Sequence, residues 1–354
     1  MQNFNRRVLQ NLAQRAVEDG DPPTLAILKG DHHAAPPPID GLEFITPKSS
    51  FGFLAQSLWR SAVDAKTLLI CHVNLLPIAI AVRLLRPRLP IILFVHGYEV
   101  WNKEGRRDKR RYENWFINVV TRIVSVSRYT AEVMGAEFNV APEKFRILPN
   151  AVDPADSPAR AAVRRSDTIL TVTRLGAKER EKNVHVMIAA VASLRRKLPS
   201  VRYEIVGEGA LRPELESLAS DLGVGDIVAF RGRIDKPALE EAYRRASVFA
   251  MPSDKEGFGI VYLEAWQHGL PVICSVHGAA SEIVSDGVEG FVVDPADVPQ
   301  LTERLYKLLT RPEMAKSMGE CGRRKVQQKY LNANFRLHLD RILDELLTDA
   351  RREV

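Results

Sequence analysis

The stretch that decides the fold is PSDKEGFGIVYLEAWQHGLPVI, residues 252–273. An apolar, strand-like run at 247–251 precedes it, a loop with two glycines opens it, and a helical pattern containing Glu264 follows. A second strand-like run begins at Val272. Strand, loop, helix and strand in this order form the unit of a parallel sheet, because parallel neighbours need a crossover connection. The stretch therefore predicts an α/β fold.

The same alternation extends through the whole chain. Strands are predicted at 24–28, 43–45, 68–71, 91–95, 123–126 and 145–148, and, after a Pro/Ala/Asp-rich link at 150–162, at 168–173, 202–206, 226–230, 247–251, 272–274 and 290–293. A pattern that runs twice predicts two Rossmann-like parallel-sheet domains, residues 1–150 and 151–332, facing each other across a cleft. Ligands of such sheets bind at the carboxyl ends of the strands.

Composition and charge argue against some classes of protein and indicate one kind of partner. The chain has 354 residues, enough for two cores, and its three cysteines form no CxxC pair, which argues against a zinc site or a disulfide framework. The N-terminus has the pattern of an amphipathic helix rather than of a signal peptide, so a cytoplasmic protein is expected. The net charge of +6 comes entirely from residues 1–150, which indicates an anionic partner: nucleic acid or an anionic membrane surface.

Residues 256–264 carry the strongest chemical signal. Gly257 and Gly259 flank Phe258, so the backbone can approach a ligand closely before a helix whose N-terminus favours phosphate. Glu256 and Glu264, separated by seven residues, can accept paired hydrogen bonds from the vicinal hydroxyls of a ribose or hexose. The alternative is a capped helix with two solvated acids.

Three further segments that directly follow predicted strands could contribute to a ligand site. Arg174 and Lys182 follow 168–173 and could neutralise a leaving pyrophosphate without metal, although a charged surface loop is the alternative. His96, after 91–95, could bind a sugar hydroxyl or serve as a structural histidine. Gly207 and Gly209 suggest a nucleotide loop, but GxG alone is weak evidence. The absence of GxxxxGK[ST] disfavours a P-loop enzyme.

Taken together, these segments resemble the retaining glycosyltransferases of family four (glycosyl transferases group 1), which have the GT-B fold. The most specific match is EGFGIVYLEA, with its two acids seven residues apart. The matches HGYEVW, VSVSRYTAEVM, ILPNAVD, IVGEGALRPELESLA and GAASEIVSDGVEGFVVDP support it in the same order along the chain.

The resemblance implies a role for each of these residues. Arg174 and Lys182 would grip the donor diphosphate, Glu264 the ribose and Glu256 the transferred sugar, with His96 near the reacting carbon. The backbone of Gly257, Phe258 and Gly259, and the loop at Gly207, would complete the donor site. It further implies retention of anomeric configuration with no metal and no cofactor, and a last helix, 333–354, that returns to the first domain.

The expected function is transfer of a hexose from a nucleotide-diphosphate sugar to a glycan or lipid-linked acceptor, in cell-surface polysaccharide or lipopolysaccharide synthesis. Two features depart from the family. The interval between Arg174 and Lys182 is long, and the family's first strand and glycine-rich turn are not found, as if the start were mis-assigned or truncated. We therefore expect the first sheet to lack an inner strand. A catalytically silent, nucleotide-binding GT-B subunit is the alternative function.

The basic, aromatic segment GRRDKRRYENWFINVVTRIV, residues 105–124, suggests how an acceptor could be reached. It could lie on an anionic membrane as a peripheral helix at the inner face, or it could be an ordinary helix with one solvated face. Nucleic acid is not an expected partner, because no nucleic-acid module is recognised.

Overall fold

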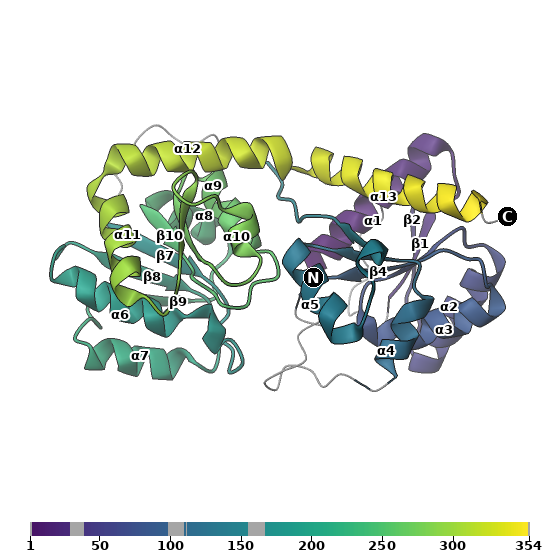
Figure 1. Cartoon of the computed structure of the whole chain (residues 1–354), viewed down its shortest axis with the longest axis horizontal. Coiled ribbons are helices and arrows are strands. Elements are labelled where there is room, and N and C mark those ends of the chain that lie inside the picture. Colours follow the sequence, from purple (N-terminus) through teal and green to yellow (C-terminus); the bar gives the residue numbers. More distant parts are fainter. Residues whose placement is uncertain (1, 29–38, 98–109, 111, 155–166, 353–354) are drawn as a thin grey trace. The chain divides into compact units, whose positions relative to one another are not determined.

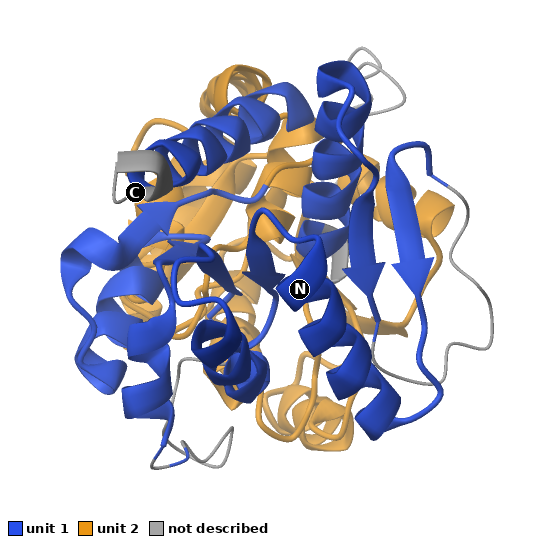
Figure 2. Cartoon of the chain, turned by 90° about the vertical axis from the view of Figure 1, so that its right-hand side faces the viewer, with its two compact units in different colours: residues 1–150, 332–354 blue, residues 151–331 orange. Residues whose placement is uncertain are grey.

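The computed structural model describes residues 2–28, 39–97, 110, 112–154 and 167–352. The chain divides into two compact units, Met1–Asn150 with Asn332–Val354, and Ala151–Leu331 (Figure 2). Each unit has its own core of buried apolar side chains. None of the described helices has both the length and the apolar composition that a membrane span requires.

Unit 1 is built on parallel strands that form two sheets, of order β1-β2 and β3-β4-β5-β6. In chain order its elements are α1 (Gln2–Asp19), β1 (Thr24–Ile27), β2 (Leu42–Ile45), α2 (Ser50–Val63), β3 (Leu68–Ile70), η1 (Val73–Leu75), α3 (Leu76–Leu85), β4 (Ile91–Val95), α4 (Glu113–Phe116), η2 (Ile117–Val119), β5 (Arg122–Ser125), α5 (Arg128–Phe138), η3 (Pro142–Lys144), β6 (Phe145–Ile147) and α13 (Asn332–Arg352). The predicted strands are confirmed to within one or two residues. Among the described residues, the strands β1 and β2 form a sheet separate from that of β3 to β6.

The last helix joins the first helix of unit 1. Arg15 of α1 pairs with Asp340 at 3.2 Å and with Asp344 at 2.6 Å, and Asn11 donates to Asn332 at 3.0 Å. Figure 1 shows α13, in yellow, beside α1, in purple. The two ends of the chain therefore stabilise one unit.

Unit 2 contains a six-stranded parallel sheet of order β12-β11-β10-β7-β8-β9. Its elements are β7 (Thr168–Val172), η4 (Arg180–Lys182), α6 (Val184–Arg195), β8 (Arg202–Val206), α7 (Arg212–Asp221), β9 (Val228–Gly232), α8 (Lys236–Arg245), β10 (Val248–Ala250), α9 (Ile260–Gln267), β11 (Val272–Ser275), α10 (Ala280–Ile283), β12 (Gly290–Val293), α11 (Val298–Thr310) and α12 (Pro312–Lys329). The strands predicted here are also confirmed, with β9 beginning two residues later than expected.

The strand order of unit 2 reverses at its centre. From β7 the chain continues to β8 and β9 on one side, and then returns to β10, β11 and β12 on the other. The loops that leave β7 and β10 therefore diverge at the carboxyl edge of the sheet. A parallel sheet binds ligands at such a switch point.

Helix α9, which carries Glu264, is held in place by α12. Trp266 of α9 is fully buried, and its indole N–H donates to the Glu289 carbonyl at 3.1 Å. A Cβ atom at Gly322 would lie 2.1 Å from the Trp266 ring, and one at Gly319 would lie 2.0 Å from the Gly269 carbonyl oxygen. Only glycine permits α12 to pack this closely on α9 and the turn after it.

We expect Gly319→Ala to lower the free energy of unfolding by about 2 kcal/mol, because α12 must move away from Gly269. Urea denaturation followed by tryptophan fluorescence measures the change, since Trp266 is buried in this unit. Ser317→Ala, on the exposed side of the same helix, is the matched control and should change stability by less than about 0.5 kcal/mol. Equal stabilities of the two variants would contradict the packing described here.

Candidate functional site

The loops after β7 and β10 are tied together at the switch point. Asn183 Nδ2 donates to the Pro252 carbonyl at 2.8 Å, and the Asp254 N–H donates to the Glu181 carbonyl at 2.8 Å. A third link joins two residues that the sequence singled out, because Lys182 Nζ lies 2.8 Å from Glu256 Oε2. The fold thus brings the two strongest sequence motifs of unit 2 into contact.

The Lys182–Glu256 pair is largely shielded from water, with 12% and 17% of the two side chains exposed. A pair this shielded interacts more strongly than one on the open surface. The ammonium has three N–H donors and the carboxylate two acceptor oxygens, so each can hold its partner and still bind another group. A phosphate could bind the lysine, and a hydroxyl could bind the glutamate.

Arg174 is exposed to solvent but is anchored at one side. Its side chain is 74% exposed, and Nη2 lies 2.7 Å from Oε1 of Glu179, which is only 8% exposed. The buried acid orients the guanidinium and leaves its other N–H groups facing solvent. This contact was not predicted from the sequence, in which the only signal for it is an acid within the Arg174–Lys182 interval.

The glycine loop is shaped by Gly259 and by contacts from the loop after β11. Gly259 has a φ of +89° and occupies the N-cap of α9, where no side-chain cap is found within the described chain. A Cβ atom there would lie 2.4 Å from the Tyr262 ring. The Ala279 N–H donates to the Glu256 carbonyl at 2.9 Å, and the Phe258 side chain is buried, 6.0 Å from the Tyr330 ring centre. Phe258 can therefore present only its backbone to a ligand.

Glu264 lies in the second turn of α9 and is bound from the side by a tyrosine. Tyr243 Oη donates to Glu264 Oε2 at 2.9 Å, and the Tyr243 ring stacks on His268 with 5.2 Å between ring centres. Burial raises the pKa of Glu264, and the hydrogen bond from Tyr243 opposes that rise. Tyr243 was not identified from the sequence, because it belongs to a different helix, α8, twenty-one residues earlier.

Gly207 permits a close approach between the ends of β7 and β8. A Cβ atom at this glycine would lie 1.6 Å from the Thr173 carbonyl oxygen, so no other residue fits without movement of the backbone. The Gly207 N–H donates to the Gly232 carbonyl at 2.9 Å. The glycine has a clear packing function beside Arg174, and its contact with a donor remains a prediction.

His96 belongs to unit 1 and follows β4, as expected. It is half-buried, and its ring packs edge-on against Phe4 with 4.8 Å between ring centres. Burial is the main cause of a pKa of His96 that is lowered to about 3, and the nearby charge of His72 contributes to the same shift. The imidazole is therefore neutral at physiological pH.

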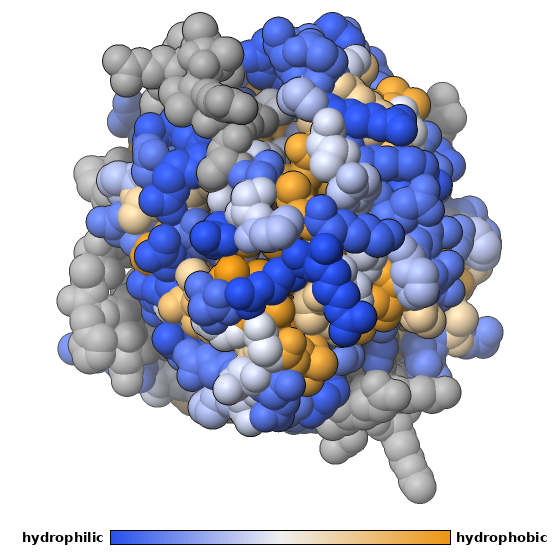
Figure 3. Space-filling model, turned by 90° about the vertical axis from the view of Figure 1, so that its left-hand side faces the viewer, coloured by the Kyte–Doolittle hydropathy of each residue, from blue (hydrophilic) through white to orange (hydrophobic). Residues whose placement is uncertain are grey.

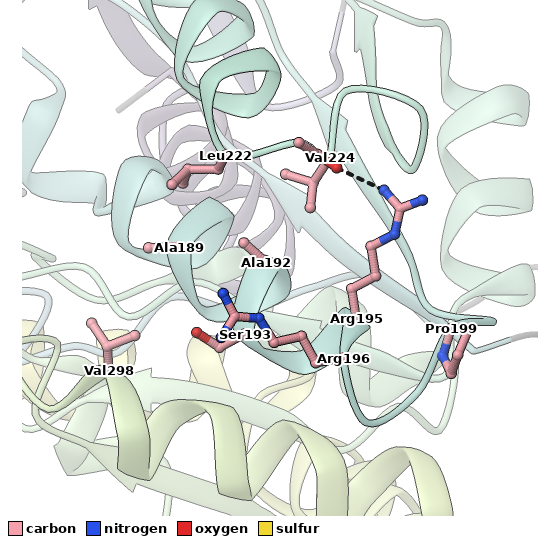
Figure 4. Close-up of a pocket in the computed structure, with 10 residues that line it drawn as sticks. Ala189, Ala192, Ser193, Arg195, Arg196, Pro199, Leu222, Val224 and Val298 are labelled. Atoms are coloured by element: carbon pink, nitrogen blue, oxygen red, sulfur yellow. Dashed lines mark hydrogen bonds between the residues drawn. The ribbon is translucent and has the colours of Figure 1, made fainter.

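Unit 2 also has a surface hollow, lined by α6, the turn after α7 and the start of α11, including Arg195, Arg196 and Leu222 (Figure 4). None of Arg174, Lys182, Glu256 and Glu264 lines it. Arg195 is bound to Asp226 and to the Gly223 carbonyl there.

The raised pKa of Glu264 predicts a dependence of stability on pH. Ionising this buried carboxyl costs free energy above its folded pKa, whereas below its usual value of 4.5 it is protonated in both the folded and the unfolded state. Glu264→Gln should therefore raise the melting temperature at neutral pH, and the difference from the wild type should vanish as the pH falls below 4.5. Thermal unfolding at both pH values tests this, and a difference that does not depend on pH would exclude it.

Two family models match consecutive parts of the chain. The model of glycosyltransferase family 4 matches residues 6–156, and that of glycosyl transferases group 1 matches residues 156–325. The first covers most of unit 1, and the second covers the switch point with Arg174, Lys182, Glu256 and Glu264.

Individual proteins agree with these family matches. A GDP-mannose-dependent alpha-(1-6)-phosphatidylinositol monomannoside mannosyltransferase of Mycolicibacterium smegmatis is 36% identical over 66% of this chain and 64% of its own length. A GDP-mannose-dependent monoacylated alpha-(1-6)-phosphatidylinositol monomannoside mannosyltransferase of Corynebacterium glutamicum is 33% identical over 68% of this chain. The chain thus spans slightly less than two thirds of these curated relatives.

Solved structures share the fold. Sucrose-phosphate synthase of Thermosynechococcus elongatus has a TM-score of 0.76 at 20% identity, over 98% of this chain and 93% of its own. The HepE protein of Anabaena, solved in complex with UDP, has a TM-score of 0.74 at 20% identity over 96% of this chain and 95% of its own. With the two family models meeting at residue 156 and the GT-B fold on both sides of it, the chain belongs to the family-four glycosyltransferases.

Proposed function

We propose that this chain transfers a hexose from a nucleotide-diphosphate sugar to a lipid-linked or glycan acceptor in the synthesis of cell-surface polysaccharide or lipopolysaccharide. The observation that carries the proposal is the contact between Lys182 and Glu256 at the switch point of the unit that also contains Arg174 and Glu264. Two cations and two acids around one sheet edge match the charges and hydroxyls of such a donor. No other described group combines these chemical features at the carboxyl edge of a sheet.

Each residue has a distinct part in donor binding. Arg174 and Lys182 offset the charge of the diphosphate, which grows on the leaving oxygen as the sugar departs. The free oxygen of Glu264 accepts hydrogen bonds from the ribose hydroxyls, while Tyr243 holds the other oxygen. Glu256 contacts the transferred sugar, and the backbone of Gly257, Phe258 and Gly259 binds sugar hydroxyls and phosphate. Gly207 lets the donor approach the ends of β7 and β8.

The transfer proceeds with retention of configuration and without a metal ion or other cofactor. The acceptor oxygen forms a bond to the anomeric carbon on the face from which the diphosphate leaves. The departing phosphate oxygen takes the proton of the acceptor hydroxyl, so the products are a glycoside and a nucleoside diphosphate. His96, neutral because of its low pKa, binds a sugar hydroxyl and is not a proton donor.

The named relatives guide the choice of substrates to test first. GDP-mannose as donor and a phosphatidylinositol mannoside as acceptor follow from the printed activity of the Mycolicibacterium smegmatis enzyme. Such an acceptor places the protein at the cytoplasmic face of a membrane as a peripheral enzyme. Residues 105–109 and 111 of the segment 105–124, which could lie on that membrane, are outside the described residues. The described part is not one continuous helix, because it forms α4, η2 and the start of β5.

A catalytically silent, nucleotide-binding subunit is the second candidate. The division of the unit 1 sheet between β1 and β3 favours it, because acceptor-side loops depend on a continuous sheet for their positions. The two candidates differ in one measurable property. An enzyme of this type hydrolyses its donor slowly in the absence of acceptor, whereas a silent subunit binds the donor and leaves it intact.

Arg174→Ala and Lys182→Ala should each lower turnover by about 10²-fold, because each removes a cation from the developing charge. Donor hydrolysis, measured by release of nucleoside diphosphate from GDP-mannose and UDP-glucose, tests this. Lys178→Ala removes an exposed cation from the same loop and is the matched control, with a rate near that of the wild type. Donor binding without hydrolysis by the wild type would identify the silent subunit instead.

The two acids should affect different steps. Glu264→Ala is expected to weaken donor binding by about tenfold or more, because ribose hydroxyls lose a charged acceptor. Glu256→Ala should mainly lower kcat, since its contact is with the transferred sugar. Calorimetric titration and steady-state kinetics separate the effects. Wild-type binding and wild-type turnover in both variants would refute the assignment of these two residues.

A further inference from the structure

Helix α2 buries Phe53 in the core of unit 1, but it also exposes large apolar side chains to solvent. The side facing the protein carries Phe53, Ser57 and Ser61, all buried, and Ser57 Oγ donates to the Phe53 carbonyl at 2.8 Å. The solvent side carries Phe51, which is 80% exposed, and Trp59, which is 64% exposed. An ordinary surface helix shows the opposite distribution, with polar residues outward.

The exposed apolar side chains of α2 form a continuous stripe. Phe51, Ala55, Trp59 and Val63 follow each other at intervals of four, which places them on one face of the helix, and all four are exposed. Leu54, also exposed, widens the stripe by one position. Four turns of outward apolar surface are what an interfacial helix presents to a lipid bilayer.

The neighbouring helix α3 also carries exposed apolar side chains. Helix α3 packs beside α2 (Figure 1), and Arg86 at its C-terminus donates to the Ser61 and Ala62 carbonyls at 3.3 and 3.0 Å. Leu84 and Leu85, just before this arginine, are also exposed. By contrast, the face of unit 2 in Figure 3 is mostly hydrophilic, with scattered apolar groups. No described apolar side chain of unit 2 is as exposed as Phe51.

The charge of the segment around α2 indicates which class of partner could bind there. Residues 46–90 contain six Lys or Arg and a single acid, Asp64, which gives a net charge of +5. Lys48, immediately before the helix, and Arg88, after α3, are both exposed. A partner that offers apolar and anionic groups on one surface matches this segment. Anionic phospholipid does so, and tryptophan prefers the level of the headgroups.

We propose that the outward face of α2, with Phe51 and Trp59 as its anchors, docks this protein on an anionic membrane surface. Insertion of the two aromatic rings buries apolar area, while Lys48 and Arg88 attract the lipid headgroups. This surface deepens the proposed function, on which it rests for its lipid acceptor. It lies outside segment 105–124, for which the sequence left open a membrane-surface helix or an ordinary helix.

Flotation of the full chain with vesicles tests the proposal. The wild type should float with vesicles of phosphatidylcholine and phosphatidylglycerol, and should float much less with phosphatidylcholine alone. Phe51→Ser/Trp59→Ser should weaken binding to the anionic vesicles by about tenfold or more. Lys48→Glu/Arg88→Glu should weaken it and reduce its dependence on salt. Leu222→Ser/Val288→Ser, which alters exposed apolar residues of unit 2, is the matched control and should bind as the wild type does.

Three results would overturn the proposal. One is equal flotation of the wild type and Phe51→Ser/Trp59→Ser. Another is flotation of the wild type that is independent of anionic lipid. The third is a dimer in light scattering that the same double substitution dissociates, since a second copy of the chain would then cover α2. Vesicle binding requires no turnover, so a protein that floats but hydrolyses no donor retains this surface and loses the proposed function.

Discussion

The pairing of β7 with β10 at the centre of the unit 2 sheet is the constraint on which the candidate site depends. Val248 and Phe249 lie beside Ile169 and Leu170, and the Thr171 hydroxyl donates to the Ala250 carbonyl. This pairing joins parts of the chain about eighty residues apart, and the reversal of strand order occurs at this point. Because both strands are buried and parallel, the loops that leave them emerge at one edge, and the polar residues of both loops meet there.

Burial then determines how the charged groups at this edge behave. Glu179 is almost inaccessible and holds Arg174, and Lys182 and Glu256 neutralise each other where little water reaches them. Glu264 has no cation among its described partners and is bound by a tyrosine hydroxyl, so its pKa rises. In the proposed function, the donor diphosphate approaches Arg174 and Lys182, and its hydroxyls approach Glu256 and Glu264.

Unit 1 combines a well-packed core with a helix that exposes apolar side chains to solvent. Its central strand β4 is buried along its entire length, and α1 and α13 are joined by ion pairs, so a stable core exists despite the division of the sheet. Helix α2 buries Phe53 and two serines and exposes the rings of Phe51 and Trp59. Phe53 in the core and the hydrogen bonds from Arg86 hold the helix in this orientation, because the exposed rings gain nothing from the core.

Local patterns in the sequence were sufficient to determine the α/β class, the positions of the strands and the candidate residues Arg174, Lys182, Glu256 and Glu264. Strand and helix periodicity, and glycines next to acids, are properties of short segments, and short segments are what a sequence displays directly. Only the tertiary structure showed that Lys182 contacts Glu256, that Glu179 anchors Arg174, that Tyr243 binds Glu264 and that α2 faces outward with its apolar side. These contacts and exposures are set by long-range packing, because they depend on which residues from distant parts of the chain become neighbours.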